Sequence, residues 1–160
     1  MKLSSPAFTH NGTIPSKYTC DGKNISPPLV IDDVPKNAKS LVLIMDDPDV
    51  PAPIRPERIW VHWILFNIPA TIREIPENCS AVSISARAGK GDYPHLNYGG
   101  PCPPPQFKPS EHRYFFKLYA LDCVLDLLEG ATKKEIENTM QKGNHVLDEA
   151  VLIGKYERKR

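Results

Sequence analysis

Hydrophobic residues along the chain fall into short runs separated by proline, glycine and asparagine. The continuous apolar run at 39–47, KSLVLIMDD, predicts a buried strand. Further strands are predicted at about 58–68, at 81–88, where apolar and polar residues alternate, and at 112–122. The segment between 89 and 111 is one long loop, and loops of this length in compact proteins are usually functional or disordered.

One helix is predicted, in the C-terminal part of the chain. Thr132 is followed three residues later by Glu135, which is the pattern of a capping box. Ile136 and Met140 share one face of this helix, and Gly143 can end it in a left-handed conformation.

Strands dominate the pattern as a whole. A second helical turn is expected near 144–148, and AVLIGKYER at 150–158 predicts a final strand. Loops rich in proline and glycine join the strands, which favours antiparallel sheets packed on one another. We therefore expect a mainly β fold, with one domain spanning 1–160 and one or two C-terminal helices.

The predicted strand WVHWILFNIP, at 60–69, carries an ionisable side chain within an apolar run. Alternate side chains of a strand point to opposite faces. One face then holds Trp60, His62, Ile64 and Phe66, and the other holds Val61, Trp63, Leu65 and Asn67. Both faces are apolar, so this strand is expected at the centre of a sheet that is covered on both sides.

The predicted strand at 112–122 opens with a related arrangement. His112 and Tyr114 share one face, whereas Arg113 points away and is expected to pair with an acidic turn. If this strand lies beside the one that carries Trp60 and His62, these groups meet at one end of the sheet. Asp47 and Asp49, in the turn DPD, can reach the same end, and the N–H groups of Gly99 and Gly100 can add an anion-binding concavity.

Charge and composition narrow the choice of partners. The 20 basic and 19 acidic residues leave a net charge of +1, which speaks against a nucleic-acid partner. No segment resembles a signal peptide or a transmembrane segment, so we expect a cytoplasmic protein. In that compartment the cysteines are expected as free thiols, with Cys20, Cys79 and Cys123 as buried small hydrophobes.

Two separated motifs resemble those of a known family. The first consists of DPDVP at 47–51 and WVH at 60–62, and the second of GPCPP at 100–104 and HRY at 112–114. In these motifs and over nearly its whole length, the chain resembles the phosphatidylethanolamine-binding protein family, which includes Raf kinase inhibitor protein. The likeness is to the shorter bacterial and archaeal branch.

The resemblance implies a large antiparallel sheet packed on a smaller one, and a small pocket for phosphate-like anions or phospholipid head groups. It also implies a homodimer and a role in modulating a protein kinase or a protease. The family's ligand-binding residues carry over to Asp47, Val50, Trp60, His62, Gly100, Pro101, His112 and Tyr114. The rim departs from the family pattern, because Tyr98 replaces a common glycine and the spacer before His112 is long.

In the expected mechanism the protein binds without catalysing a reaction and needs no cofactor. His62 and His112 donate to the anion, Tyr114 adds a hydroxyl donor, and Gly100 lets the backbone approach the ligand. Asp47 orients one imidazole from behind. We also expect cis peptide bonds at Asp47–Pro48 and Val50–Pro51, where the chain must reverse sharply.

Two enzyme classes remain as alternatives. Asp47, His62 and His112 match the two-histidine, one-carboxylate set that binds Fe(II). Cys102 lies in the predicted rim near two histidines, and a Cys–His pair can act as a nucleophile.

Overall fold

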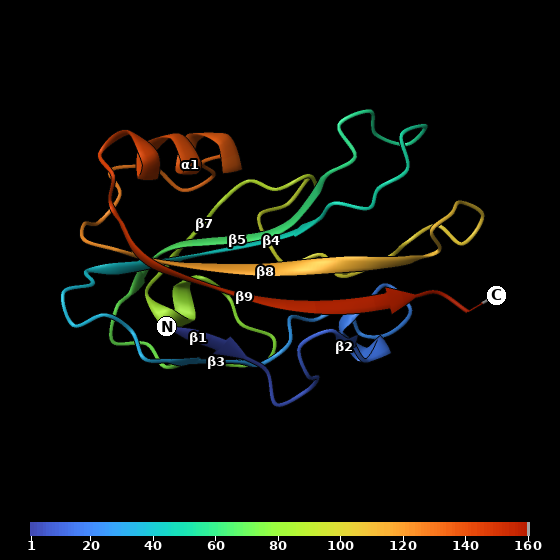
Figure 1. Cartoon of the computed structure of the whole chain (residues 1–160), viewed down its shortest axis with the longest axis horizontal. Coiled ribbons are helices and arrows are strands. Elements are labelled where there is room, and N and C mark those ends of the chain that lie inside the picture. Colours follow the sequence, from blue (N-terminus) through green and yellow to red (C-terminus); the bar gives the residue numbers. More distant parts are fainter. Residues whose placement is uncertain (160) are drawn as a thin grey trace.

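The computed structural model describes residues 1–159, which form two β-sheets and one α-helix in three layers (Figure 1). The small sheet has the strand order β1-β3-β6, and the large sheet has the order β2-β9-β8-β4-β5-β7. The strands are β1 (Lys2–Ser4), β2 (Gly12–Thr13), β3 (Leu29–Asp32), β4 (Ser40–Asp47), β5 (Trp60–Pro69), β6 (Glu74–Ile75), β7 (Arg87–Ala88), β8 (Glu111–Leu121) and β9 (Val146–Glu157). The helices are α1 (Lys133–Lys142) and two 3₁₀ turns, η1 (Ser16–Tyr18) and η2 (Val82–Ile84).

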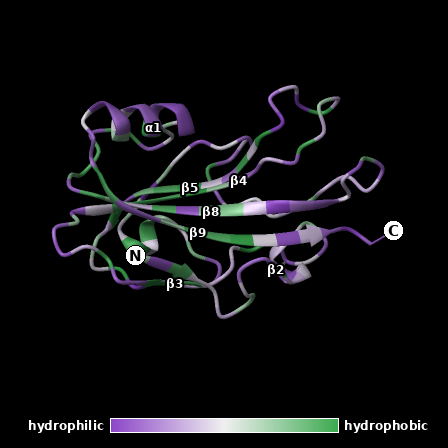
Figure 2. Ribbon diagram, viewed as in Figure 1, coloured by the Kyte–Doolittle hydropathy of each residue, from purple (hydrophilic) through white to green (hydrophobic). Residues whose placement is uncertain are grey.

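The central strands β4 and β5 are buried on both faces, as their continuous apolar runs predict, whereas β8 is buried along the face that carries His112 and Tyr114 and partly exposed on the other. Along β4, Leu41 and Leu43 pack in the cluster between the two sheets, whereas Val42 and Ile44 pack in a second cluster that includes residues of α1. Figure 2 shows hydrophobic residues concentrated in these middle strands, and mainly hydrophilic residues in α1 and the outer loops. The prediction of a mainly β fold with a large sheet packed on a smaller one is therefore confirmed.

The helix forms as its sequence predicts at the N-terminal end. The backbone N–H of Glu135 donates to Oγ1 of Thr132 at 3.2 Å, and the Thr132 N–H donates back to the Glu135 carboxylate at 3.3 Å. Ile136 and Met140 are buried beneath the helix. At the other end, Gly143 has a φ of −102°, so it does not take the left-handed conformation that we expected. Asn144, with a φ of 52°, takes it instead.

Two further predictions about elements are wrong. Residues 82–84 form a 3₁₀ turn and only Arg87–Ala88 pair as a strand, so no strand spans 81–88. The expected helical turn near 144–148 is absent, because β9 begins at Val146 and pairs with β8 along its whole length. The large sheet is antiparallel except at its edge, where β2 pairs with β9 in parallel.

Within residues 1–159 no helix combines the length and the hydropathy needed to cross a membrane.

Candidate functional site

A pocket of about 290 Å³ lies where β4 ends and where β5 and β8 begin. The loop between β4 and β5 and the loop before β8 extend from this same end of the large sheet (Figure 1). The pocket is lined by Asp47, Val50, Ile54, Trp60, His62, Tyr93, Cys102, Pro103, Pro104, His112 and Tyr114. The predicted convergence of the two motifs at one end of a sheet is therefore present in the structure.

The strands that carry the two histidines are not neighbours, so the groups meet without the side-by-side placement that we considered from the sequence. β4 lies between β5 and β8, and its last residue, Asp47, is paired with Trp60. His62 of β5 and Tyr114 of β8 lie on the same face of the sheet near the end of β4, so their side chains approach each other across this strand. The ring centroids of His62 and Tyr114 lie 5.2 Å apart, and those of His112 and Tyr114 lie 6.5 Å apart.

His62 reaches the pocket because the register of β5 shifts. Met45 of β4 pairs with Trp63, but the next residue, Asp46, pairs with Val61, so His62 is an extra residue on its strand. Ile64 packs in the cluster that includes α1 residues, while His62 contacts Tyr114 on the side of the small sheet. The predicted simple alternation from 60 to 66 is therefore wrong. Extra residues of this kind re-aim side chains and are common beside functional sites.

The buried Asp47 carboxylate fixes the orientation of His112. Nδ1–H of His112 donates to Oδ2 of Asp47 at 2.7 Å, and both side chains are almost fully buried. The other carboxylate oxygen accepts from the backbone N–H of Asp49 at 2.7 Å, which holds the carboxylate in place. Since Nδ1 is engaged, Nε2 is the atom of His112 that remains for a ligand.

Polar atoms without a partner concentrate in this pocket. Among the buried side-chain nitrogen and oxygen atoms of residues 1–159, those without a hydrogen bond are Trp60 Nε1, His112 Nε2 and the Tyr114 hydroxyl. Burial raises the pKa of Tyr114, and the nearby Asp47 carboxylate raises it further, so the hydroxyl keeps its proton. Asp47 comes close to this hydroxyl without forming a hydrogen bond of good geometry. Buried polar groups are normally paired, so this concentration calls for an explanation.

His62 differs from His112 in its partner and in its charge. Its Nδ1–H donates to the carbonyl oxygen of Gly99 at 2.7 Å. Burial lowers the pKa of His62 below its usual value, because the charged form loses its hydration. At neutral pH the ring is thus uncharged, and its Nε2 is an acceptor. The expectation that both imidazoles donate to an anion does not hold for His62 near neutral pH.

Gly100 and Pro101 are not among the residues that line the pocket. The N–H of Gly100 donates to Oδ1 of Asn24 at 2.7 Å, and the N–H of Gly99 donates to the His62 carbonyl oxygen at 3.3 Å. Neither N–H is therefore available for the anion-binding concavity that we expected. A Cβ on Gly100 would lie 2.2 Å from the carbonyl oxygen of Tyr18, so the glycine serves close backbone packing.

A disulfide between Cys20 and Cys102 forms part of the pocket wall. It overturns the prediction of free thiols for these two residues, and it removes the Cys102 nucleophile from consideration because the sulfur is already bonded. Cys79 and Cys123 are free, but they are half-buried and not fully buried as expected. Disulfides are typical of oxidising compartments, whereas the expectation of free thiols assumed a reducing one.

The iron-binding alternative does not fit the geometry. Among residues 1–159, the group of three or more His, Cys, Asp or Glu side chains with ligand atoms within 4.8 Å of one another lies elsewhere. Asp47, His62 and His112 therefore do not converge on one point, and Nδ1 of each imidazole already has a protein partner.

The cis peptide bonds expected at Asp47–Pro48 and Val50–Pro51 are absent. Within residues 1–159 the cis bond lies between Lys108 and Pro109, in the loop before β8. The pairing of Arg113 with an acidic turn is confirmed, since its guanidinium forms two hydrogen bonds, of 2.9 and 3.0 Å, with the carboxylate of Asp49.

Sequence reasoning missed Tyr93 as part of the pocket. Its hydroxyl donates to the carbonyl oxygen of Gly100 and lies 3.3 Å from Nδ1 of His62. It also missed Arg55, which stacks on the Trp60 ring at 4.6 Å and pairs with Asp92 at 3.0 Å. Both residues lie in long loops, where no periodicity indicates which side chains turn inward.

Comparisons with known proteins agree with this architecture. The family model described as phosphatidylethanolamine-binding protein matches residues 4–157. A UPF0098 protein of Methanothermobacter thermautotrophicus is 49% identical, over 99% of each chain, and one of Chlamydia pneumoniae is 43% identical, also over 99% of each.

Solved structures show the same fold. CT736 from Chlamydia trachomatis, a candidate homolog of phosphatidylethanolamine-binding protein, is 42% identical and superimposes with a TM-score of 0.90, over 99% of this chain and 97% of the other. YbcL from E. coli, described as a member of the mammalian PEBP family, is 25% identical, with a TM-score of 0.83 over 99% and 98% of the two chains. With its two motifs, its fold and these relatives, the chain belongs to the phosphatidylethanolamine-binding protein family.

Proposed function

We propose that the pocket binds the oxyanion of a small phosphorylated molecule or of a phospholipid head group. The observation that carries this proposal is the set of buried, unpartnered polar atoms on Trp60, His112 and Tyr114. A buried donor without a partner costs about 1–3 kcal/mol, and a ligand with several oxygen acceptors offsets that cost at Trp60 and Tyr114, and also at His112 when its ring carries both protons.

The pocket offers the ligand both hydrogen-bond donors and one acceptor. Trp60 and Tyr114 offer N–H and O–H donors, and His112 donates through Nε2 when it is protonated. His62, which is neutral because of its lowered pKa, accepts through Nε2. The pocket therefore suits a phosphate that retains one hydroxyl, or an ammonium group that lies beside the phosphate.

The size and walls of the pocket limit the ligand to a small one. A volume of about 290 Å³ is at the low end of the roughly 300–1,000 Å³ that ligand pockets span. Val50, Ile54, Pro103 and Pro104 make the wall largely apolar, and the disulfide at Cys102 stiffens it. The polar end of the ligand belongs inside, and any longer group must extend through the mouth.

We infer that binding is the function and that no reaction follows it, in keeping with the family's name. A partner protein that binds at the mouth of the pocket would then distinguish the occupied pocket from the empty one. A protein kinase or a protease is the partner class that the family resemblance suggests, and a homodimer is the assembly it suggests. Native mass spectrometry of the purified protein, alone and mixed with a candidate kinase, checks both expectations.

Calorimetric titration tests the proposal itself. Phosphorylethanolamine and inorganic phosphate should bind at pH 7, whereas ethanolamine should not. Tyr114→Phe removes one hydroxyl from the pocket and should weaken phosphorylethanolamine binding roughly 10- to 100-fold, because hydrogen bonds to charged groups contribute about 1.5–3 kcal/mol.

Tyr119→Phe is the matched control, because Tyr119 lies on the same strand, half-buried and outside the pocket. Its affinity should equal that of the wild type. Equal affinity of the Tyr114→Phe protein, or equally tight binding of ethanolamine, would refute the proposal.

A further inference from the structure

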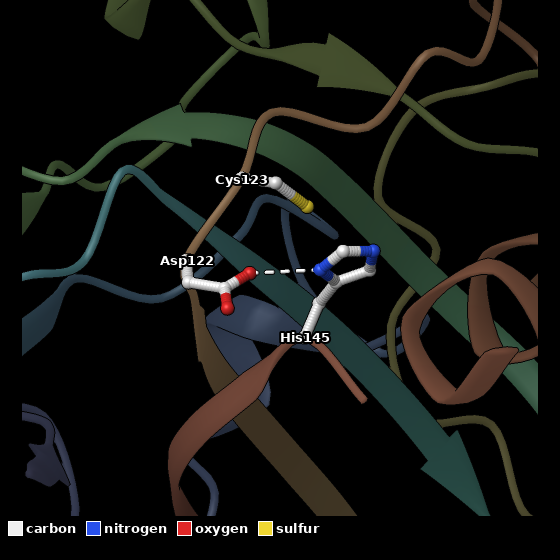
Figure 3. Close-up of side chains that lie close together, drawn as sticks. All are labelled: Asp122, Cys123 and His145. Atoms are coloured by element: carbon white, nitrogen blue, oxygen red, sulfur yellow. Dashed lines mark hydrogen bonds and ion pairs between the residues drawn. The ribbon is translucent and has the colours of Figure 1, made fainter. Parts of the chain in front are cut away.

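A second group of chemically active side chains lies at the other end of β8. Asp122 and Cys123 directly follow this strand, and His145 directly precedes β9 (Figure 3). The ten-residue separation from His112 along an extended strand corresponds to roughly 30 Å, so this group is distinct from the pocket. Each of the three residues offers one ligand atom, and these atoms all lie within 4.8 Å of one another.

Nδ1 is the imidazole atom that faces the group. It lies 2.8 Å from Oδ1 of Asp122, and in Figure 3 the Cys123 sulfur points toward the same ring. Gly143 permits this position, since a Cβ there would lie 2.1 Å from the opposite ring nitrogen, Nε2. The ring is thus turned so that Nδ1 is directed to the carboxylate and the thiol.

Backbone hydrogen bonds hold the two contributing segments together without any metal. The N–H of Asp122 donates to the carbonyl oxygen of His145 at 3.0 Å, and the N–H of His145 donates to that of Met140 at 3.0 Å. The Ser40 hydroxyl donates to the Cys123 carbonyl oxygen at 2.5 Å. Because the main chain is fixed on both sides, little ordering entropy remains to be lost when the three side chains bind an ion.

We propose that Asp122, Cys123 and His145 bind a divalent cation of the zinc class. Imidazole nitrogen, thiolate sulfur and carboxylate oxygen are the ligands that Zn²⁺ takes in proteins, and thiolate selects against Mg²⁺ and Ca²⁺. Three protein ligands leave one position of a tetrahedron for water, and Asp122 is exposed while the other two are half-buried. On binding, the thiol releases its proton to solvent, and the imidazole proton moves from Nδ1 to Nε2 through solvent, so that the sulfur and Nδ1 can bond to the metal.

Titration of the purified protein with Zn²⁺ and with Co²⁺ tests the proposal. We expect one Zn²⁺ per chain by calorimetry, and a thiolate-to-metal absorption band with Co²⁺. Cys123→Ser should weaken Zn²⁺ binding at least about tenfold and abolish the band. Cys79→Ser changes the other free thiol and should leave both measurements unchanged.

A measurement on the unmodified chain covers the case in which a variant fails to fold. Zn²⁺ should slow the alkylation of Cys123 by iodoacetamide, detected by peptide mass spectrometry, while Cys79 serves as the internal reference. Unchanged alkylation of Cys123 at saturating Zn²⁺ would overturn the proposal. So would the same Zn²⁺ affinity in the wild-type and Cys123→Ser proteins.

Discussion

Asp46 and Asp47 are consecutive, almost fully buried carboxylates at the end of β4, yet they belong to two different regions. Asp46 faces the helix side, where ammonium groups of Lys117 and Lys133 lie 3.1 and 3.0 Å from its Oδ2. Asp47 faces the pocket, where, within residues 1–159, its ionic partner is His112 and the far nitrogen of that ring has no hydrogen-bond partner.

The difference separates a structural carboxylate from one that serves a ligand. On the helix side the carboxylate has partners within the protein, because two ammonium groups lie beside it. On the pocket side a series of hydrogen bonds runs from Asp49 through Asp47 to His112 and ends at Nε2, which has no partner. Nε1 of Trp60 and the hydroxyl of Tyr114 also lack a partner. A region whose hydrogen bonds are left incomplete toward one cavity is a region prepared for a partner.

The largest effect should come from the cross-link that holds the pocket wall. Cys20 and Cys102 are 82 residues apart, and closing a loop of that length stabilises a fold by about 4 kcal/mol in the chain-entropy model. The double variant Cys20→Ser/Cys102→Ser should lose roughly that free energy of unfolding. Urea unfolding measures it, with Cys79→Ser as the control.

The comparison of the two carboxylates is sharpened by paired variants. Asp46→Asn should lower the free energy of unfolding by about 2 kcal/mol, less than for a fully buried pair because both lysines are partly exposed. Asp47→Asn should instead weaken phosphorylethanolamine binding about tenfold, because it removes the charge that holds His112. The distinction between the two carboxylates fails if Asp46→Asn weakens phosphorylethanolamine binding and Asp47→Asn does not.

Features that depend on local sequence could be predicted, whereas features that depend on tertiary contacts could not. The strands at 39–47 and 112–122 and the helix after Thr132 follow from apolar periodicity and capping, which are local properties. The extra residue at His62 results from the register of β5 against β4. The alternation of residues within 60–69 does not determine that register. The Cys20–Cys102 bond likewise depends on tertiary contact, and an assumed reducing compartment led to the wrong prediction.

Local competition explains the failed strand at 81–88. The Ser83 hydroxyl donates to the carbonyl oxygen of Ser80 at 2.7 Å, and Ser85 takes a φ of 57°. Serine side chains that bond to nearby backbone favour turns over strands, although their spacing with Val82 and Ile84 imitates a strand. The pocket residues on strands were predictable, whereas the pocket residue Tyr93 was missed because it lies on a loop. Arg55, which packs on Trp60 outside the pocket lining, was missed for the same reason.

A smaller effect is expected from the pH dependence of folding. The pKa of His62 is lowered in the folded protein by burial, so the unfolded chain, with a value near 6.5, binds the proton more tightly. Stability from this group is therefore complete above about pH 6.5 and is lost as the pH falls, by at most about 1.4 kcal/mol per pH unit.

Urea unfolding from pH 7.5 to pH 5 measures this loss. In His62→Gln, where the amide can still donate to Gly99, the stability should depend less on pH over that range. An identical pH dependence in the two proteins would mean that His62 does not titrate differently on folding.

The smallest effect should come from the ion pair at the outer edge of the pocket end. Arg113 is about half exposed, and such pairs contribute about 0–1 kcal/mol. Arg113→Gln should therefore change the free energy of unfolding by less than about 1 kcal/mol and leave ligand affinity unaltered. A large loss of affinity would extend the binding region beyond the pocket lining.

The pairing of β2 with β9 has a consequence for how the protein is made. Gly12 and Thr13 find their sheet partners in Gly154 and Lys155, at the far end of the chain. During synthesis on a ribosome, β2 therefore cannot form its sheet pairing until almost all of the remaining chain has emerged. Long-range pairing of this kind slows folding and leaves hydrophobic segments exposed in the meantime. Nascent chains halted before residue 146 should therefore depend on chaperones far more than chains that have released β9.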